Sequence, residues 1–437
     1  MTAGGHGDAS DGSTQYASLS GDATAETVAP AAAAAPRRFA ALGVPAFRWY
    51  WIMSSISITG DGMENILRNW LVWEITRSPL WLGMMVFAHW IPFTLFSLYG
   101  GILADRYDNR KVQLVAQLLL LAAALGVAVA TLAGFVTEWW IFGFLLLHGF
   151  AGAIGNPAQQ TLIHDIVGPS RLLSAVSLNS STRQVSQVVG PVIGGYILLV
   201  FGPGLGFMVN ALTFLPLLLF LTMLRVRRPS PIRVPQPLRE AFGEGLRFLR
   251  SRPTAASLIA VEMVPVIFLG HAFNSLLPVF VTDVLHTDEL GYAFLLAGSG
   301  LGAFLAAVGL AYASEIRRKG LVIVSAAAVE VLAILFFALS TSYFVSVALM
   351  VAVGAATVLT QALTNTTLQL AAPDRLRGRV MGAYSFGTQG TRVVNGPLLG
   401  TLALLLGAPL AVAWSAGAVL VALAVIVVSV PRLREVD

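Results

Sequence analysis

Residues 100–111 read Gly-Gly-Ile-Leu-Ala-Asp-Arg-Tyr-Asp-Asn-Arg-Lys, a charged segment between two long apolar runs. The flanking runs, 80–99 and 112–134, are each long enough to cross a bilayer as a helix, which takes about 20 residues. The segment therefore predicts a tight turn at a membrane surface. Gly101 precedes Asp105 by four residues and would let another helix approach this acid closely.

The composition indicates a membrane protein along the whole chain. Of the 437 residues, 56% are apolar and 11% are charged, whereas soluble domains carry about 25% charged residues. The apolar runs are continuous and lack the alternation of barrel strands, so we expect them to span the membrane as helices. The chain has no cysteine, which excludes disulfides, thiol catalysis and cysteine-ligated metal.

Twelve apolar runs are long enough to be membrane spans, so the expected fold is an all-α membrane protein with twelve transmembrane helices. The runs are 48–74, 80–103, 111–135, 139–163, 174–202, 204–225, 256–284, 291–314, 320–340, 343–370, 381–406 and 409–430.

The regions outside these runs complete the expected domain organisation. Residues 1–36 contain few large apolar groups and should be a disordered N-terminus. The linker 227–254 is rich in Pro and Arg, and its segment 237–249 has the pattern of an amphipathic helix on the membrane surface. It separates an N-terminal bundle (37–226) from a C-terminal bundle (255–430), which is followed by a tail (431–437).

Arginine is concentrated in the segments that would share one side of the membrane. With the N-terminus in the cytoplasm, the clusters at 106–111, 225–252, 317–319 and 375–379 are all cytoplasmic. Because basic loops stay inside, we expect both termini in the cytoplasm.

The chain repeats itself at an offset of about 205 residues. Thr161 to Leu172 leads to Gly190-Pro191-Val-Ile-Gly194, and Thr367 to Leu376 leads to Gly396-Pro397-Leu-Leu-Gly400. Internal repeats of this kind are typical of transporters whose site lies between two similar halves. We therefore expect two pseudo-symmetric six-helix bundles around a central cavity.

Gly101-Ile-Leu-Ala-Asp105-Arg106, followed by Arg110-Lys111, resembles the signature between spans 2 and 3 of the major facilitator superfamily. Gly190 to Gly195 resembles the span-5 motif of exporters in that superfamily. The segments 61–76, 156–157 and 277–285 resemble the bacterial branch of enterobactin and macrolide exporters. The resemblance implies a conformational latch that closes the cytoplasmic ends of the two halves, formed by Gly101, Asp105, Arg106, Arg110 and Arg379.

Charged groups inside the spans are costly and usually functional. Asp61, Glu64 and Arg68 share one helical face. A self-neutralising pair of Glu64 with Arg68 is one interpretation, whereas Asp61 is the favoured proton-coupling group. Glu330 has two interpretations, as a proton carrier or as a contact between two helices, and both stay open. The coupling candidates are therefore Asp61, Glu64 and Glu330. Glu262 is expected to be a structural acid near the membrane surface.

Two matching polar stripes, in spans 5 and 11, each precede a Gly-Pro bend and are expected to face the cavity. With polar groups of spans 1, 7 and 10, the predicted substrate cavity comprises Arg68, Arg183, Gln187, His271, Asn274, Gln361, Asn365, Gln389 and Arg392. His89 and His148 are interpreted as lone residues on apolar faces, and we expect no metal.

These observations predict a secondary transporter that exports an amphipathic small molecule in exchange for protons across a bacterial cytoplasmic membrane. The chain has no Gly-x-x-x-x-Gly-Lys motif, so the proton motive force rather than ATP is expected as the energy source, with no cofactor. The expected partners are the substrate, protons and membrane lipid, and we expect no nucleic-acid partner. The protein is expected to be a monomer. The alternatives are an importer or proton symporter of the same fold, a gradient-independent flippase for lipid-like substrates, and a sensor. A membrane enzyme would need a clustered nucleophile or metal set, which the sequence does not contain.

Overall fold

The structure, a computed structural model, describes residues 1, 39–225, 243, 244, 247, 251–313, 316, 318–373 and 376–430. Within helices it leaves out the side chains of Leu98, Asp105, His271 and Arg377. Met1–Arg38 and Phe39–Asp437 are separate units, and the fold is that of the second. The disorder expected for 1–36, the amphipathic helix expected over 237–249 and the tail 431–437 fall almost wholly outside the described residues.

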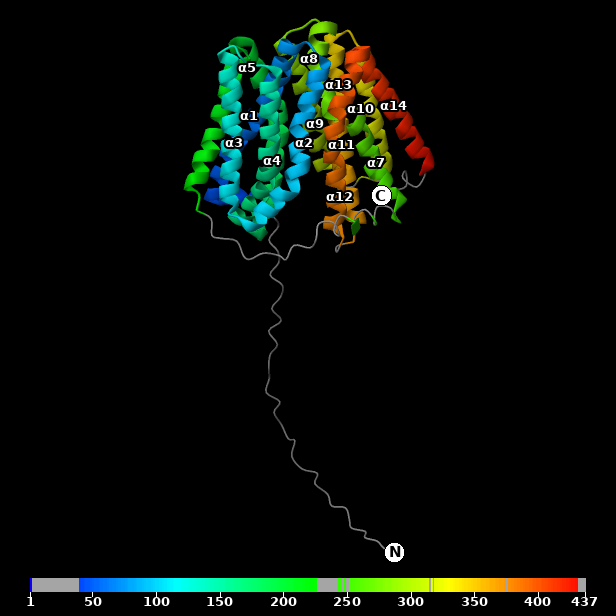
Figure 1. Cartoon of the computed structure of the whole chain (residues 1–437). Helices are drawn as coiled ribbons and strands as arrows, with labels where there is room; N and C mark the ends of the chain where they lie inside the picture. The colour runs from blue at the N-terminus through cyan, green and yellow to red at the C-terminus, as the bar shows by residue number, and fades with distance from the viewer. Residues whose placement is uncertain are drawn as a thin grey trace. The chain divides into compact units, whose positions relative to one another are not determined.

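All regular elements in the described part of the chain are helical (Figure 1). In chain order they are η1 (Ala40–Gly43), α1 (Pro45–Thr76), α2 (Pro79–Arg106), α3 (Asn109–Leu132), α4 (Glu138–Val167), η2 (Pro169–Arg171), α5 (Leu172–Met223), α7 (Pro253–Phe268), α8 (Gly270–Val279), η3 (Phe280–Val284), α9 (Glu289–Tyr312), α10 (Lys319–Leu339), α11 (Tyr343–Ala371), α12 (Arg377–Gly390), α13 (Arg392–Leu406) and α14 (Ala408–Ser429).

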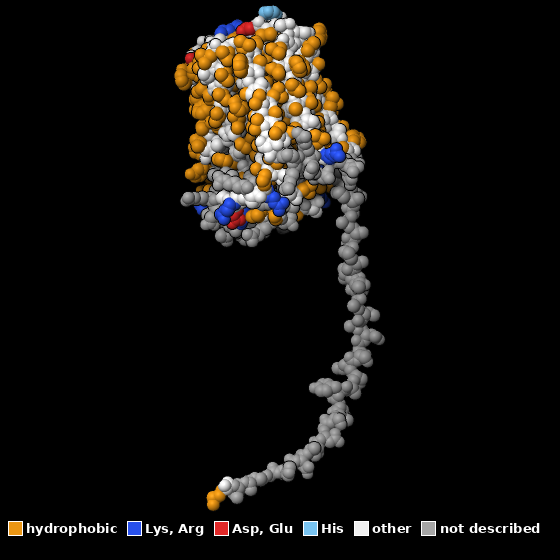
Figure 2. Space-filling model, turned by 90° about the vertical axis from the view of Figure 1, so that its right-hand side faces the viewer, with side chains coloured by type: hydrophobic (Ala, Val, Ile, Leu, Met, Phe, Trp, Pro, Cys, Tyr) orange, Lys and Arg blue, Asp and Glu red, His pale blue; other side chains and the backbone are white. Residues whose placement is uncertain are grey.

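Among the described residues, nine helices or merged helical stretches are long and apolar enough to cross a membrane. The stretch Pro169–Met223 counts once although it covers two expected spans. Helix α1 is 32 residues long but carries Asp61, Glu64 and Arg68, and it is not one of the nine. Figure 2 shows a face covered by hydrophobic side chains with charged ones gathered at its ends, as a lipid-facing surface requires. The protein is therefore a multi-pass membrane protein.

Helix α5 bends where the sequence predicts one span to end and the next to begin. Gly202 interrupts its helical geometry with φ 74° and ψ 173°. Glycine adopts this conformation without the steric penalty of a side chain, and Pro203 follows at once. The expected runs 174–202 and 204–225 thus join directly, without a loop.

Two runs that the sequence predicts as unbroken helices, 256–284 and 381–406, are each interrupted. Helix α7 contains Pro265 and ends at Phe268, and α8 starts at Gly270 with φ 39°. A helix end leaves carbonyl groups without intrahelical partners. Asn395 of α13 donates a 2.9 Å hydrogen bond from Nδ2 to the carbonyl of Val266, which satisfies one of them. The second interruption separates α12 from α13 at Thr391.

Helices from each half of the sequence pack mainly with one another. Helix α1 packs on α5, and α3 packs on both α4 and α5; in the second half α11 packs on α9 and α10. Figure 1 shows α1 to α5 grouped on the left and α7 to α14 on the right. The two groups meet where α2 packs on α13 and α5 on α9.

The groups also meet at the end where α1 finishes. Trp73 donates a 3.0 Å hydrogen bond from Nε1 to the Thr282 hydroxyl of η3. Asn69 donates to the hydroxyl of Tyr292 at 3.3 Å, and Trp70 stacks on the same tyrosine with ring centroids 6.1 Å apart. Polar and aromatic contacts therefore close this end of the helix assembly.

The expectation that Gly101 permits a close helix approach is wrong in this structure. A Cβ atom added at Gly101 would have no neighbour within 4 Å among the described residues. One added at the preceding Gly100 would contact the backbone of Ala153 and Ile154 in α4. The close approach of α2 to α4 therefore uses Gly100, because successive residues of a helix point about 100° apart.

Candidate functional site

Two adjoining cavities lie between α5 and helices of the second half. Their volumes are about 270 Å³ and 370 Å³. They share the lining residues Gln184, Glu262, Val266, Val358, Gln361 and Arg392. We call the two together the polar cavity, because acids, amides and an arginine stand on its wall.

The polar cavity contains most of the residues that the sequence predicts for substrate binding. Those on its wall are Gln187, Asn274, Gln361, Asn365, Gln389 and Arg392. The predicted Arg68 and Arg183 belong to other side-chain groups, described below, and the side chain of His271 lies outside the description.

Glu262 is a wall residue that the sequence analysis did not assign to the cavity. We expected a structural acid near the membrane surface, and only 6% of the residue is exposed. The hydroxyl of Tyr384 in α12 donates to its carboxylate, 2.8 Å from each oxygen. The pairing joins residues 122 positions apart, and the local pattern around Glu262 does not signal it.

Glu330 of α10 also lies on the cavity wall. Thr357 of α11 donates a hydrogen bond to its carboxylate at 2.9 Å. Glu330 therefore does connect two helices, as one interpretation held, while facing the space that a proton carrier would need. Proton coupling at Glu330 stays a prediction.

Arg392 brings a positive charge to the same wall. Its guanidinium carbon lies 4.6 Å from the ring centroid of Trp90 in α2, within the range of a cation–π interaction. Its Nε atom is buried and has no hydrogen-bond partner among the described residues. The wall thus offers a guanidinium donor on the same cavity as the carboxylates of Glu262 and Glu330, with Trp90 supplied by the other half of the chain.

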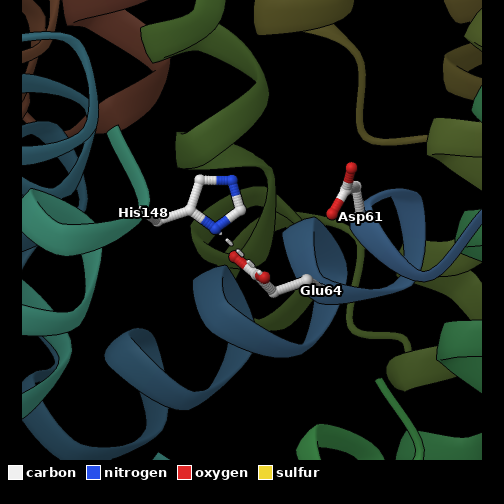
Figure 3. A group of neighbouring side chains, drawn as sticks. All are labelled: Asp61, Glu64 and His148. Carbon is white, nitrogen blue, oxygen red and sulfur yellow. Dashed lines mark ion pairs between the residues drawn. The ribbon is translucent and has the colours of Figure 1, made fainter. Parts of the chain in front are cut away.

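A second group of ionisable side chains surrounds Glu64 in the first half (Figure 3). Arg68 lies 3.5 Å from one carboxylate oxygen of Glu64, as the i,i+4 pair predicts. His148 Nδ1 of α4 lies 3.4 Å from the other oxygen, to which Asn210 donates at 3.1 Å. The interpretation of His148 as a lone residue without ligand geometry is wrong, because α4 brings it against the acids of α1.

Arg183 belongs to a hydrogen-bonded seam between α1, α4 and α5. It donates to Gln159 at 3.0 Å, and Gln159 donates to Ser54 at 3.3 Å. The hydroxyls of Thr59 and Ser186 lie 3.0 Å apart along the same seam. The span-5 stripe therefore divides, since Ser186 packs on α1 and Gln187 lies on the wall of the polar cavity.

Of the predicted latch residues, Arg110 and Arg379 have described polar partners. Arg110 donates from Nη1 to the carbonyl of Leu224 at 2.6 Å, at the end of α5. Arg379, near the start of α12, forms an ion pair with Glu244. Arg106 is exposed, and the side chain of Asp105 is outside the description. The latch stays a prediction.

The comparisons with known proteins agree with a transport protein. Residues 36–437 match the family model described as transmembrane secretion effector, of the major facilitator type. The enterobactin exporter EntS of Shigella flexneri is 26% identical over 396 residues, covering 90% of this chain and 94% of EntS. EntS of Escherichia coli (strain SMS-3-5 / SECEC) is also 26% identical, with the same coverage.

Solved structures share the fold. A bacterial homologue of the human lysosomal transporter Spinster, in an inward-facing and unoccupied conformation, matches with a TM-score of 0.66 at 15% identity, covering 90% of this chain and 96% of its own. The nucleoside transporter NupG matches with a TM-score of 0.69 at 14% identity, covering 88% and 98%.

Proposed function

This chain belongs to the transmembrane secretion effector family of the major facilitator superfamily, and from that premise we propose that it exports an amphipathic small molecule in exchange for protons. Its family and relatives are transporters and not enzymes. We further propose twelve spans in two six-helix bundles, with alternating access to the cavity between the bundles. Both termini would lie in the cytoplasm of a bacterial cell.

The observation that carries the proposal is the make-up of the polar cavity. Glu262, Glu330 and Arg392 all line a space between the two halves. An arginine there can bind an anionic or hydrogen-bond-accepting group of the substrate. A carboxyl in a low-dielectric cavity can bind and release protons as the substrate comes and goes. Opposite charges on one wall therefore allow substrate and proton to affect each other's binding.

We place the coupling proton at Glu330 first. Glu330 lines the polar cavity and has one described hydrogen-bond donor, Thr357. Glu262 also lines the cavity, but Tyr384 donates to both of its oxygens. Asp61 and Glu64, the other coupling candidates from the sequence, belong to the separate group around His148. Position on the substrate's path thus favours Glu330.

The proposed substrate class follows from the cavity and the relatives. The wall combines amides, a guanidinium above an aromatic ring and apolar side chains such as Phe273 and Ile334, which suits a molecule with both polar and apolar parts. The relatives named enterobactin exporter favour a siderophore or similar secondary metabolite.

Transport into everted membrane vesicles tests the proposal. Candidate substrates are first identified as metabolites that are present in the medium of a producing strain and absent from that of a deletion strain. Everted vesicles that contain the wild-type protein should accumulate these metabolites when the vesicle interior is acidic. A protonophore should abolish this accumulation. Uptake only into right-side-out vesicles would instead identify an importer, and gradient-independent movement of a lipid-like probe would identify a flippase.

A further inference from the structure

The group formed by Asp61, Glu64 and His148 has the composition of a metal site. Each residue offers one ligand atom, and these atoms all lie within 4.8 Å of one another. Figure 3 shows the imidazole reaching from α4 toward the two carboxylates, which project from successive turns of α1. Two helices therefore converge one nitrogen and two oxygen ligands at a point inside the helix assembly.

The spacing suits a small cation with short bonds. His148 Nδ1 and the Glu64 oxygen are 3.4 Å apart. Two ligands of a tetrahedral zinc ion, with bonds of about 2.0–2.2 Å, are separated by roughly 3.3 Å. Asp61, three residues before Glu64 on the same face of α1, can supply the third ligand after a side-chain rotation, since its ligand atom lies within 4.8 Å of the other two. A nitrogen ligand and a low coordination number do not suit calcium or magnesium, which prefer six or more oxygens.

The hydrogen bonding around the group differs between its two carboxylates, and Asp61 is the less satisfied one. Its Oδ1 atom is buried and accepts no hydrogen bond from any described residue. A buried acceptor without a partner is costly. Glu64, in contrast, is 1% exposed and is held by Asn210 and Arg68. Glu64 is thus already oriented, whereas Oδ1 of Asp61 is a buried ligand atom with no described hydrogen-bond donor.

The charges leave room for one dication. Arg68 compensates one of the two carboxylates. With a neutral imidazole, the group keeps one net negative charge, which a divalent ion converts to one net positive charge. His89 of α2 places a second imidazole beside His148, with the two ring centroids 5.1 Å apart.

We propose that Asp61, Glu64 and His148 bind a single divalent ion of the zinc class. The ion ties α1 to α4 within the first half of the chain. It leaves the polar cavity unoccupied by metal, because none of the three ligands lies on that wall. Metal binding is therefore separable from substrate transport.

The test uses the full chain purified in detergent with an affinity tag that has no histidine. Zn²⁺ binding is measured by competition with a chromophoric chelator, and Co²⁺ by its visible d–d absorption. We expect one high-affinity ion per chain and a higher Tm with metal. His148→Gln and Asp61→Asn should each weaken binding at least about tenfold, as the loss of a ligand or its support does.

His164→Gln is the matched control, because His164 lies on the same helix and its side chain is 49% exposed beside Asp165. It should bind zinc like the parent. His148→Cys gives a positive signal for binding, whereas loss of binding in the other variants could also come from misfolding. Since the native chain has no cysteine, a thiolate-to-cobalt charge-transfer band in this variant would prove coordination at position 148. Absence of that band together with unchanged Zn²⁺ affinity of His148→Gln would overturn the proposal, as would a parent chain that binds no Zn²⁺.

Discussion

Gly83 of α2 and Gly396 of α13 touch through their backbones, so that a Cβ atom added to either one would collide with the carbonyl oxygen of the other. The two glycines come from different halves of the chain, and their contact lies near the end where α1 finishes. Small residues permit such approaches between helices in membranes. The Gly-Pro-x-x-Gly motif of the second half thus forms an interface between the halves, while Gly190 of the first half packs on Gly62 of α1.

Gly83→Val should disfavour this contact, at a cost of roughly 1–3 kcal/mol, because overpacking forces the helices apart. We expect a lower Tm and reduced transport at normal expression. Gly417→Val on α14 is the control, since an added Cβ there meets nothing within 4 Å of the described residues. Equal Tm values and transport rates for the two variants would contradict the contact.

Glu330→Gln should bind substrate and catalyse exchange of labelled for unlabelled substrate, while losing accumulation driven by a proton gradient. The amide retains the shape and can still pair with Thr357, but it cannot carry the proton. Glu138→Gln, at the start of α4 and away from the polar cavity, is the control. Gradient-driven accumulation at the parental rate by Glu330→Gln would move the coupling site to another acid.

Single cysteines at 392 and 183 should behave differently toward a thiol reagent. Arg392 lines the polar cavity, so substrate should slow the labelling of Arg392→Cys at least severalfold. Arg183 is exposed but is not on that wall, so Arg183→Cys should label without protection by substrate. The chain has no native cysteine, which keeps the background low. Equal protection at both positions would contradict the placement of Arg392, and not Arg183, on the wall of the polar cavity.

Asp105→Asn should leave expression intact and abolish net transport, because the family resemblance makes this acid the centre of the latch. Asp108→Asn tests a neighbouring acid whose described role is to accept a hydrogen bond from the Arg110 backbone at the start of α3. We expect that variant to keep the helix cap, because Asn and Asp are about equally good N-cap residues, and to transport. Full activity of Asp105→Asn would remove the latch.

Hydropathy was sufficient to predict where the helices lie. The bounds of α3, α9 and α14 fall within three residues of the expected runs, because the length of an apolar run is set by the membrane and not by tertiary contacts. The interruptions at Gly270 and Thr391 could not be predicted this way. They depend on contacts between helices. Asn395 of α13, for example, donates a hydrogen bond to the carbonyl of Val266 near the end of α7.

The site was predicted in part for a similar reason. Polar stripes identify Gln389 and Arg392 as cavity residues, because polar groups avoid lipid wherever the helix is placed. Helical periodicity could not assign Glu262 or His148, since their partners Tyr384 and Glu64 lie on other helices. Which acids meet which bases is decided by helix packing, and the periodicity of one helix does not show which other helices pack against it.

The hydrogen bond from Asn395 to Val266 has a mechanical consequence. It ties α7, before its interruption at Leu269, to α13, which follows the interruption at Thr391, so that a rotation of either segment is resisted by the other. Glu262 and Tyr384 join α7 to α12 in the same way. Any change in the width of the polar cavity must therefore move α7 together with α12 and α13, or break one of these two contacts.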